Sequence, residues 1–203
     1  MEKGLAIITG ADGGMGQVIT AALAKEGYPV IMACLDPEKA ASLCNRIQQE
    51  TGNTQIEVRR IDLASLSSVN NFTSQLLKEG RPVSRLMNNA GILTTPVRKT
   101  EDGLETIVSV NYVAPYMLTR QLLPLMQPGC RIVNTVSCTY AIGRIEPDFF
   151  EKGRNGRFFR IPVYSNTKLA LLLFTQEFAE RLQDKDITIN AVSYTHLRAH
   201  ETG

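Results

Sequence analysis

LAIIT, residues 5–9, runs directly into GADGGMG, residues 10–16. The first stretch is a short apolar run, which is typical of a buried strand in a parallel sheet. The glycines that follow permit a sharp turn, because glycine adopts backbone angles that other residues avoid. Residues 14–26 continue as a helix, and Gly27 ends it. The chain therefore opens with a predicted strand, a tight turn and a helix.

The same alternation of strand and helix continues along the chain. Short apolar or alternating runs predict further strands at residues 30–34, 56–61, 83–87, 130–136 and 187–191. Capping residues and helical periodicity predict helices at residues 36–51, 65–78, 101–123 and 162–183. Asp36 is the expected cap of the first of these helices, and Ser65 or an adjacent serine of the second. This order predicts an α/β fold, a doubly wound parallel sheet of the Rossmann type in a single domain.

Composition and charge exclude several classes of protein. The 203 residues suit one domain with a sizeable core, and a net charge of +2 argues against a nucleic-acid or anionic-membrane partner. No apolar run is long enough to predict a membrane-spanning helix. The N-terminus shows no signal-peptide pattern, and the four cysteines lack C-x-x-C spacing. We therefore expect a cytoplasmic protein with reduced thiols.

The last stretch of the chain, VSYTHLRAHETG at residues 192–203, has a different character. It matches a translated reading frame of a transposon-end sequencing adapter, so we expect the natural domain to comprise residues 1–191 and to be incomplete at its C-terminus. His196 and His200 both fall in this stretch. Their spacing could ligate a metal on a helix, but the adapter origin outweighs that alternative, and we expect no metal site.

The glycine-rich turn has the features of a phosphate-binding site. Its glycines let the backbone approach a pyrophosphate, and the following helix supplies free N–H groups and a partial positive charge. A tight turn without a ligand is the alternative, but the position directly after an N-terminal strand favours the phosphate. The expected binding residues here are Thr9, Gly10, Asp12, Gly13, Gly14, Met15 and Gly16.

Polar or small residues also follow the third and fourth predicted strands. Asp62-Leu63 follows the third strand, and Asn88-Asn89-Ala90-Gly91 follows the fourth. Because parallel strands end at one edge of the sheet, these residues should converge with the glycine turn. Small residues at 90–91 would let an adenosine ribose lie against the backbone. The alternatives are a helix-capping role for Asp62 and an ordinary polar turn at 88–91.

Tyr164 and Lys168 are four residues apart and should share one face of a helix. Reduction of a carbonyl requires a hydride at carbon and a proton at oxygen. A tyrosine with a pKa of about 10 is a poor acid–base near neutrality, but a neighbouring ammonium can lower that pKa. Such a pair also arises by chance, so its context matters. Ser137 supplies that context at the end of the fifth strand, either as a hydrogen-bond donor to a substrate oxygen or as a cap.

With these motifs the chain resembles the short-chain dehydrogenase/reductase family, over about residues 4–191. The T-G-x-x-x-G-x-G turn, the N-N-A-G at 88–91 and the Y-x-x-x-K pair carry the resemblance. It implies an oxidoreductase that transfers a hydride between NAD(P) and a small-molecule alcohol or carbonyl, with Tyr164 as general acid–base. It also implies that Lys168 binds the nicotinamide ribose and that Asn111 holds a local helix distortion and a proton-relay water. The implied catalytic residues are Asn111, Ser137, Tyr164 and Lys168.

The resemblance implies that Tyr164 and Lys168 also contact the cofactor. It implies further cofactor contacts at the strand ends, by Leu35, Asp62, Leu63, Asn89, Ala90 and Gly91. NAD-preferring members carry an acid where this chain has Cys34, and NADP-preferring members often carry an arginine where it has Leu35. MACLD at 32–36 otherwise resembles the MACRD of NADP-linked retinol-dehydrogenase-like members, which favours NADP. Lys39 could reach a 2′-phosphate, or be an exposed helix lysine.

The chain departs from the family pattern between Ser137 and Tyr164, which are 27 positions apart, about twice the usual gap. The extra residues, 141–161, resemble an insertion of retinol-dehydrogenase-like and protochlorophyllide-reductase-like members. They carry Phe149, Phe150, Phe158 and Phe159, and form either a cover over an apolar substrate or a surface hairpin. The apolar stretch 169–174 could bind a second subunit or be buried within one.

Three hypotheses about function follow. The first is the oxidoreductase. The second is a non-catalytic dinucleotide-binding regulator, which the presence of both Tyr164 and Lys168 disfavours. The third is an inactive fragment, because the family's seventh strand and its substrate-selecting segment would lie beyond Ala191. The substrate itself cannot be predicted from these residues.

Overall fold

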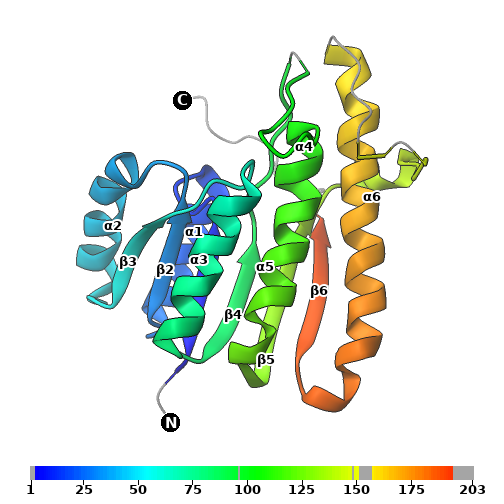
Figure 1. Cartoon of the computed structure of the whole chain (residues 1–203). Helices are drawn as coiled ribbons and strands as arrows, with labels where there is room; N and C mark the ends of the chain where they lie inside the picture. The colour runs from blue at the N-terminus through cyan, green and yellow to red at the C-terminus, as the bar shows by residue number, and fades with distance from the viewer. Residues whose placement is uncertain (1–2, 96, 148, 151–156, 194–203) are drawn as a thin grey trace.

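The structure is a computed structural model that describes residues 3–95, 97–147, 149–150 and 157–193. The adapter-like residues beyond 193, with His196 and His200, lie outside the described residues, as do the side chains of Phe158 and Phe159. Within the described residues, six parallel strands form one sheet in the order β3-β2-β1-β4-β5-β6 (Figure 1). The doubly wound α/β fold is therefore confirmed.

The strands and helices alternate as the sequence predicts. In chain order they are β1 (Leu5–Thr9), α1 (Gly14–Lys25), β2 (Val30–Cys34), α2 (Pro37–Thr51), β3 (Ile56–Arg60), α3 (Leu66–Glu79), β4 (Val83–Asn88), α4 (Thr106–Val108), the π-helix η1 (Ser109–Val113), α5 (Ala114–Leu122), the 3-10 helix η2 (Leu123–Leu125), β5 (Met126–Val136), the 3-10 helix η3 (Cys138–Ile142), α6 (Arg157–Leu182), the 3-10 helix η4 (Gln183–Lys185) and β6 (Thr188–Ser193).

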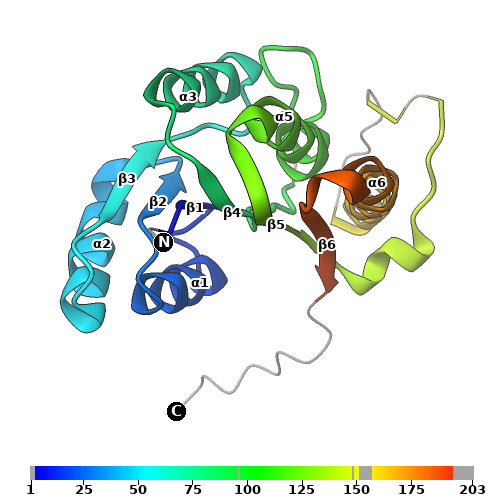
Figure 2. The ribbon, with the colours of Figure 1, turned by 90° about the horizontal axis from the view of Figure 1, so that it is seen from below.

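Helices cover the sheet on both sides. α1 and α2 lie on one face, and α3, α5 and α6 lie on the other (Figure 2). Every residue of β1 and β2 is buried, because successive side chains of a strand point to opposite faces and both faces are covered here. Ile7 packs into the core on the α3–α5–α6 side, and its neighbour Ile8 into the core on the α1–α2 side.

The predicted helix start at Glu101 is wrong. The sequence predicts a helix from Glu101, but helical structure begins at Thr106. Residues 101–103 form a turn instead, in which Gly103 has a φ of +78°. The turn lies against the N-terminus of α3, where Asp102 Oδ2 accepts a hydrogen bond from the Leu66 N–H at 2.9 Å. An acid is favourable at a helix N-terminus, and this tertiary contact outweighs the local helical preference.

The other differences concern element ends. α6 begins at Arg157, five residues before the predicted start, so that Pro162 lies inside the helix. β5 begins at Met126, four residues early, and β6 continues to Ser193, two residues beyond the predicted natural end. These last two residues of β6 pair with Thr135 and Val136 of β5. Strand pairing across the sheet, which local sequence does not encode, sets the ends of β5 and β6.

The two predicted helix caps are confirmed. Asp36 accepts a hydrogen bond from the Lys39 N–H, and Ser65 from the Ser68 N–H, so both cap their helices. All four cysteines are free. Among the described residues, no helix is both long and apolar enough to span a membrane.

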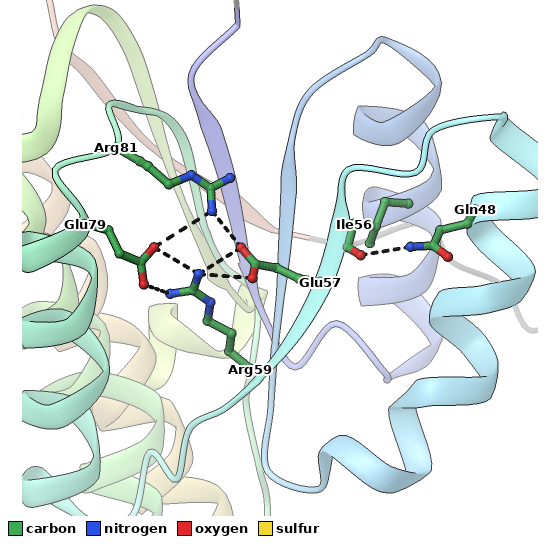
Figure 3. A network of polar contacts seen from close by, with 6 residues as sticks. All are labelled: Gln48, Ile56, Glu57, Arg59, Glu79 and Arg81. Carbon is green, nitrogen blue, oxygen red and sulfur yellow. Dashed lines mark hydrogen bonds and ion pairs between the residues drawn. The ribbon is translucent and has the colours of Figure 1, made fainter.

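A network of four charged side chains joins β3 to the C-terminal end of α3 (Figure 3). Arg59 Nη1 donates to Glu79 Oε1 at 2.6 Å, and Arg59 Nη2 donates to Glu57 Oε1 at 2.9 Å. Arg81 closes the network with a 2.7 Å bond to Glu57. Hydrogen bonding from Arg59 holds the pKa of Glu79 below its ordinary value, while Glu79 raises the pKa of Arg59.

Glu79→Gln should lower the free energy of unfolding at pH 7 by about 0.5–1 kcal/mol, a value reduced by solvent screening of these half-exposed groups. A carboxyl whose pKa is lower in the folded state stabilises the fold above its unfolded pKa. That stabilisation is lost as the pH falls through the lowered folded pKa. The difference between the two proteins should therefore disappear in acid, and shrink in high salt. Urea denaturation across pH would measure it, with the exposed Glu180→Gln as control; a difference independent of pH would contradict it.

Candidate active site

A cleft of about 480 Å³ opens at the carboxyl ends of the strands, where the strand order reverses between β1 and β4. It brings together three groups of residues predicted from the sequence: the glycine turn, the turn after β4, and the Tyr–Lys pair of α6. Two further residues, Ile92 and Thr135, lie in its wall. The lining consists of Gly10, Asp12, Gly13, Gly14, Met15, Gly16, Asn89, Ala90, Gly91, Ile92, Thr135, Tyr164 and Lys168.

The glycine turn depends on close backbone contacts. Gly10 has a φ of +61°, and its N–H donates to the carbonyl of Ala33 in β2 at 2.9 Å. A Cβ atom at position 16 would lie 2.1 Å from the Gly10 carbonyl oxygen, so only glycine fits there. At Gly14, by contrast, a Cβ would meet nothing within 4 Å. The first residue of α1 therefore faces open space beside the cleft.

Thr9 fastens the glycine turn to the turn after β4. The Thr9 side chain is 1% exposed, and its Oγ1 accepts hydrogen bonds from the N–H groups of Asn89 and Ala90, both at 3.1 Å. Asn89 Nδ2 donates in return to the carbonyls of Thr9 at 3.1 Å and Gly10 at 3.3 Å. Thr9 thus lies behind the cleft, where it holds the two turns side by side.

Lys168 is 2% exposed, and its Nζ donates to the Thr135 carbonyl at 2.8 Å. Burial lowers the pKa of Lys168 to about 8. A Cβ at position 91 would lie 3.3 Å from Nζ, so Gly91 leaves room for the ammonium group. The turn after β4 and the end of β5 together place this cation in the wall of the cleft.

Tyr164 lies on the same face of α6 as Lys168, whose Nζ is 5.5 Å from the centre of the tyrosine ring. The sequence predicts a lowered pKa for Tyr164, but in the structure burial raises it. The hydrogen bond with Ser137 lowers the pKa by less than burial raises it. The Lys168 ammonium does not reverse this direction; it is bound to the Thr135 carbonyl.

Ser137 both caps η3 and contacts Tyr164. Its Oγ accepts hydrogen bonds from the N–H of Thr139 at 3.3 Å and from the Thr139 hydroxyl at 3.1 Å. Since Ser137 also hydrogen-bonds Tyr164, the two alternatives for this residue, a cap and a group at the reacting oxygen, are compatible.

Asn111 lies in the π-helix η1, so the helix distortion that the resemblance implies is present. Its side chain is fully buried. Oδ1 accepts from the Ile92 N–H at 2.8 Å, and Nδ2 donates to the Ile92 carbonyl at 2.9 Å and to Thr167 Oγ1 at 3.4 Å. Asn111 thus connects the turn after β4 to α6, one residue before Lys168.

Besides Thr9, three predicted cofactor residues lie outside the cleft lining. The Leu35 side chain is 60% exposed beyond the end of β2. Asp62 Oδ1 accepts from the Ala64 N–H at 2.9 Å in the turn before α3, whose cap is Ser65 and not Asp62, and the Leu63 carbonyl accepts from Ser109 Oγ at 3.0 Å. Their contacts with a cofactor stay predictions. No group of three or more His, Cys, Asp or Glu side chains that could hold a metal occurs in the described part of the chain.

The aromatic insertion is partly buried. Phe149 is 7% exposed and packs edge-on against Tyr112 with the ring centres 5.7 Å apart, whereas Phe150 is 46% exposed. In the apolar stretch of α6, Phe174 is buried within the subunit and Leu173 is 47% exposed. Internal packing, one of the two alternatives in each case, therefore accounts for Phe149 and Phe174.

Residues 4–147 match the family model for short chain dehydrogenases. The chain belongs to this family. Among curated relatives, this short-chain dehydrogenase is 36% identical to human retinol dehydrogenase 13 over 200 residues, 96% of this chain and 60% of the relative. It is 37% identical to mouse retinol dehydrogenase 12 over 188 residues, 92% of this chain and 59% of the relative. It thus spans about 60% of the length of these relatives.

Solved structures agree with this fold. This chain aligns with a TM-score of 0.82 to an uncharacterised protein from Mycobacterium paratuberculosis, at 34% identity over 96% of this chain and 70% of that protein's chain. A short-chain dehydrogenase from Sphingobium yanoikuyae, solved in complex with NADPH, aligns with a TM-score of 0.73 at 22% identity, over 94% of this chain and 70% of that one. The second match shows similarity of fold alone.

Replacing Gly16 with alanine should destabilise the short-chain dehydrogenase by about 2–3 kcal/mol, because the new Cβ would overlap the Gly10 carbonyl and force the turn to move. Gly14→Ala is the matched control, since its Cβ enters open space, and it should change the stability by less than about 0.5 kcal/mol. Thermal unfolding of the ligand-free proteins measures both. Equal effects of the two substitutions would refute the close contact.

Proposed function

We propose that this chain forms the catalytic part of an oxidoreductase that transfers a hydride between a nicotinamide dinucleotide and an alcohol or carbonyl substrate. The observation that carries the proposal is the single cleft lined by both the glycine turn and the Tyr164–Lys168 pair. Membership of the family supports the same chemistry. A regulator that only binds a dinucleotide would not need both of these side chains at the cleft.

The cleft residues fit a nicotinamide dinucleotide. The open space at Gly14 lies beside the N-terminus of α1, which favours a pyrophosphate. Ala90 and Gly91 line the cleft with backbone and a single methyl group, and Lys168 would offer ammonium hydrogens to ribose hydroxyls. When bound, the nicotinamide supplies or accepts the hydride.

The chain's own residues would handle the proton. Tyr164 would donate a proton to the substrate oxygen during reduction and accept one during oxidation. Ser137 would donate a hydrogen bond to the same oxygen. A positive charge on Lys168 would favour the phenolate form of Tyr164. Burial raises the pKa of Tyr164, and the hydrogen bond with Ser137 lowers it. Asn111 would keep the π-helix and Ile92 in place beside the pair.

The substrate we propose is an apolar alcohol or aldehyde. Two curated relatives are named as retinol dehydrogenases, although the chain spans only about 60% of their length. Several apolar side chains of the insertion and of the turn after β4 are exposed, as an apolar substrate would require. They are Leu93, Ile142, Ile145, Phe150 and Ile161. A cytoplasmic location and self-association stay predictions from the sequence.

For the cofactor we propose a preference for NADP that depends on Lys39. This lysine is 83% exposed in its side chain, beyond the end of β2, and its Nζ lies 3.0 Å from Asp36 Oδ2. Asp12 lies beside Cys34 at the end of β2: burial first, and then Asp12, raises the pKa of that thiol to about 12. A 2′-phosphate would therefore have to share Lys39 with Asp36.

Tyr164→Phe should lower kcat at least about a hundredfold, because it removes the group that exchanges the proton with the substrate oxygen. The dissociation constant for NADPH, measured by its fluorescence, should change by less than about twofold, since the ring and its packing remain. Tyr28→Phe, at the opposite edge of the sheet, is the control and should retain full turnover. Normal turnover by Tyr164→Phe would rule out its role as acid–base.

Lys39→Ala should weaken NADPH binding about fivefold and leave NADH binding unchanged, because only NADPH carries the 2′-phosphate. Asp36→Asn should act in the opposite sense: asparagine still caps α2 but no longer neutralises Lys39, so NADPH should bind more tightly. Lys78→Ala, on the exposed face of α3, is the control. Equal affinities of the unaltered protein for the two cofactors, unmoved by either substitution, would disprove the NADP preference.

A further inference from the structure

Glu105 and Arg160 form a buried ion pair beside the cleft. Arg160 Nη2 donates to Glu105 Oε1, and the two side chains are 0% and 1% exposed. Arg160 Nε donates to the Thr94 carbonyl at 2.8 Å. The second oxygen of Glu105 accepts from the N–H groups of Ile107 at 2.7 Å and Val108 at 3.1 Å, and so caps α4.

The pair joins three segments, each of which carries part of the candidate active site. The turn after β4 reaches Thr94 two residues after Ile92, which lines the cleft. α4 leads directly into the π-helix that contains Asn111. Arg160 lies four residues before Tyr164, one helical turn away on the same face of α6.

A second set of contacts joins the same three segments. Asn111 bonds twice to Ile92 and once to Thr167. The ion pair therefore acts at the start of α6 and Asn111 acts two turns further along, so that Tyr164 lies between two cross-links. Without the first cross-link, the apolar cluster that contains Ile107, Val108 and Val163 would still lie between α4 and α6, but it has no directional hydrogen bonds.

Stability alone does not account for a buried ion pair. Removing two charges from water costs about as much as their attraction returns, and apolar residues of similar volume often replace such a pair without loss of stability. Apolar residues cannot replace the directional hydrogen bonds that the two charged side chains make. The hydrogen bonds to Thr94, Ile107 and Val108 fix the angle and the register of three segments at once.

We propose that Glu105 and Arg160 are a positioning pair for the proposed reaction, holding the first turns of α6 in register with α4 and the π-helix so that the Tyr164 hydroxyl stays at its working place. The pair touches neither substrate nor cofactor and acts through Tyr164 and Asn111. This inference rests on the proposed function, because its effect is on the step in which Tyr164 takes part.

The test replaces both charges together, because a single substitution would leave one buried charge without its partner and could unfold the protein. The variant is Glu105→Leu with Arg160→Met. Its matched control is Glu177→Leu with Arg181→Met, which removes an ion pair of 2.6 Å from the same helix at an exposed position. Both are compared with the unaltered protein by thermal unfolding, NADPH fluorescence titration and kcat for an apolar aldehyde.

The Glu105/Arg160 variant should still unfold cooperatively, at a lower melting temperature because Glu105→Leu removes the cap of α4. It should bind NADPH within about twofold, because the glycine turn is untouched. Its kcat should fall about 30- to 100-fold, since a displacement of about 1 Å at a reacting group costs on that order. The control should keep its kcat. An unchanged kcat in a folded variant, or a loss of kcat matched by an equal loss of NADPH affinity, would overturn the proposal.

Fluorine NMR separates this inference from the proposed function. With 3-fluorotyrosine incorporated, the Tyr164 resonance is assigned by its absence in Tyr164→Phe. It should shift or broaden in the Glu105/Arg160 variant and not in the control, whether or not any substrate is turned over. If the unaltered protein shows no turnover but the Tyr164 resonance still shifts in the Glu105/Arg160 variant, only the proposed function is contradicted. An unmoved resonance would contradict the positioning role.

Discussion

The approach of α1 to β1 at Gly10 and Gly16 is the contact on which the rest of the molecule depends. A Cβ at position 16 would lie 2.1 Å from the Gly10 carbonyl, so the helix can start this close to the strand only because no side chain intervenes. The N-terminus of α1 then faces the place where the strand order reverses. Thr9 and Asn89 extend the same geometry to β4, so that the cleft floor is one hydrogen-bonded surface. The placement of a phosphate site follows from this single close contact.

Much of the fold could be predicted because its signals are local. β1 and β2 are buried on both faces and read as unbroken apolar runs, and the caps Asp36 and Ser65 lie next to the helices they begin. The start of α4 was not predictable from residues 101–105, because Asp102 bonds to Leu66, far away in the sequence. The ends of β5 and β6 likewise depend on each other, and neither carries a local signal for its length.

The candidate site divides in the same way. The glycine turn and the Tyr164–Lys168 pair follow fixed spacings, and the cleft brings them together. Thr135 was missed because it offers Lys168 a backbone carbonyl, which no side-chain pattern reveals. Glu105 and Arg160 are 55 positions apart and each looks like an ordinary surface charge until the fold buries them. The direction of the Tyr164 pKa was mispredicted for a related reason: sequence spacing gives the neighbouring charge but not the depth of burial.

The network of Glu57, Arg59, Glu79 and Arg81 affects whether two copies of this chain can associate through β3. β3 is an outermost strand of the sheet, and such a strand can pair with a strand of another molecule. Backbone carbonyls alternate in direction along a strand. The Gln55 carbonyl accepts a hydrogen bond from the Val30 N–H in β2, so the next carbonyl, of Ile56, points away from the sheet. Gln48 Nε2 donates a hydrogen bond to this outward carbonyl at 2.9 Å. Charged side chains tied to α3 lie alongside (Figure 3). An incoming strand would have to displace Gln48 and strip water from those charges, and this border of the sheet therefore resists aggregation.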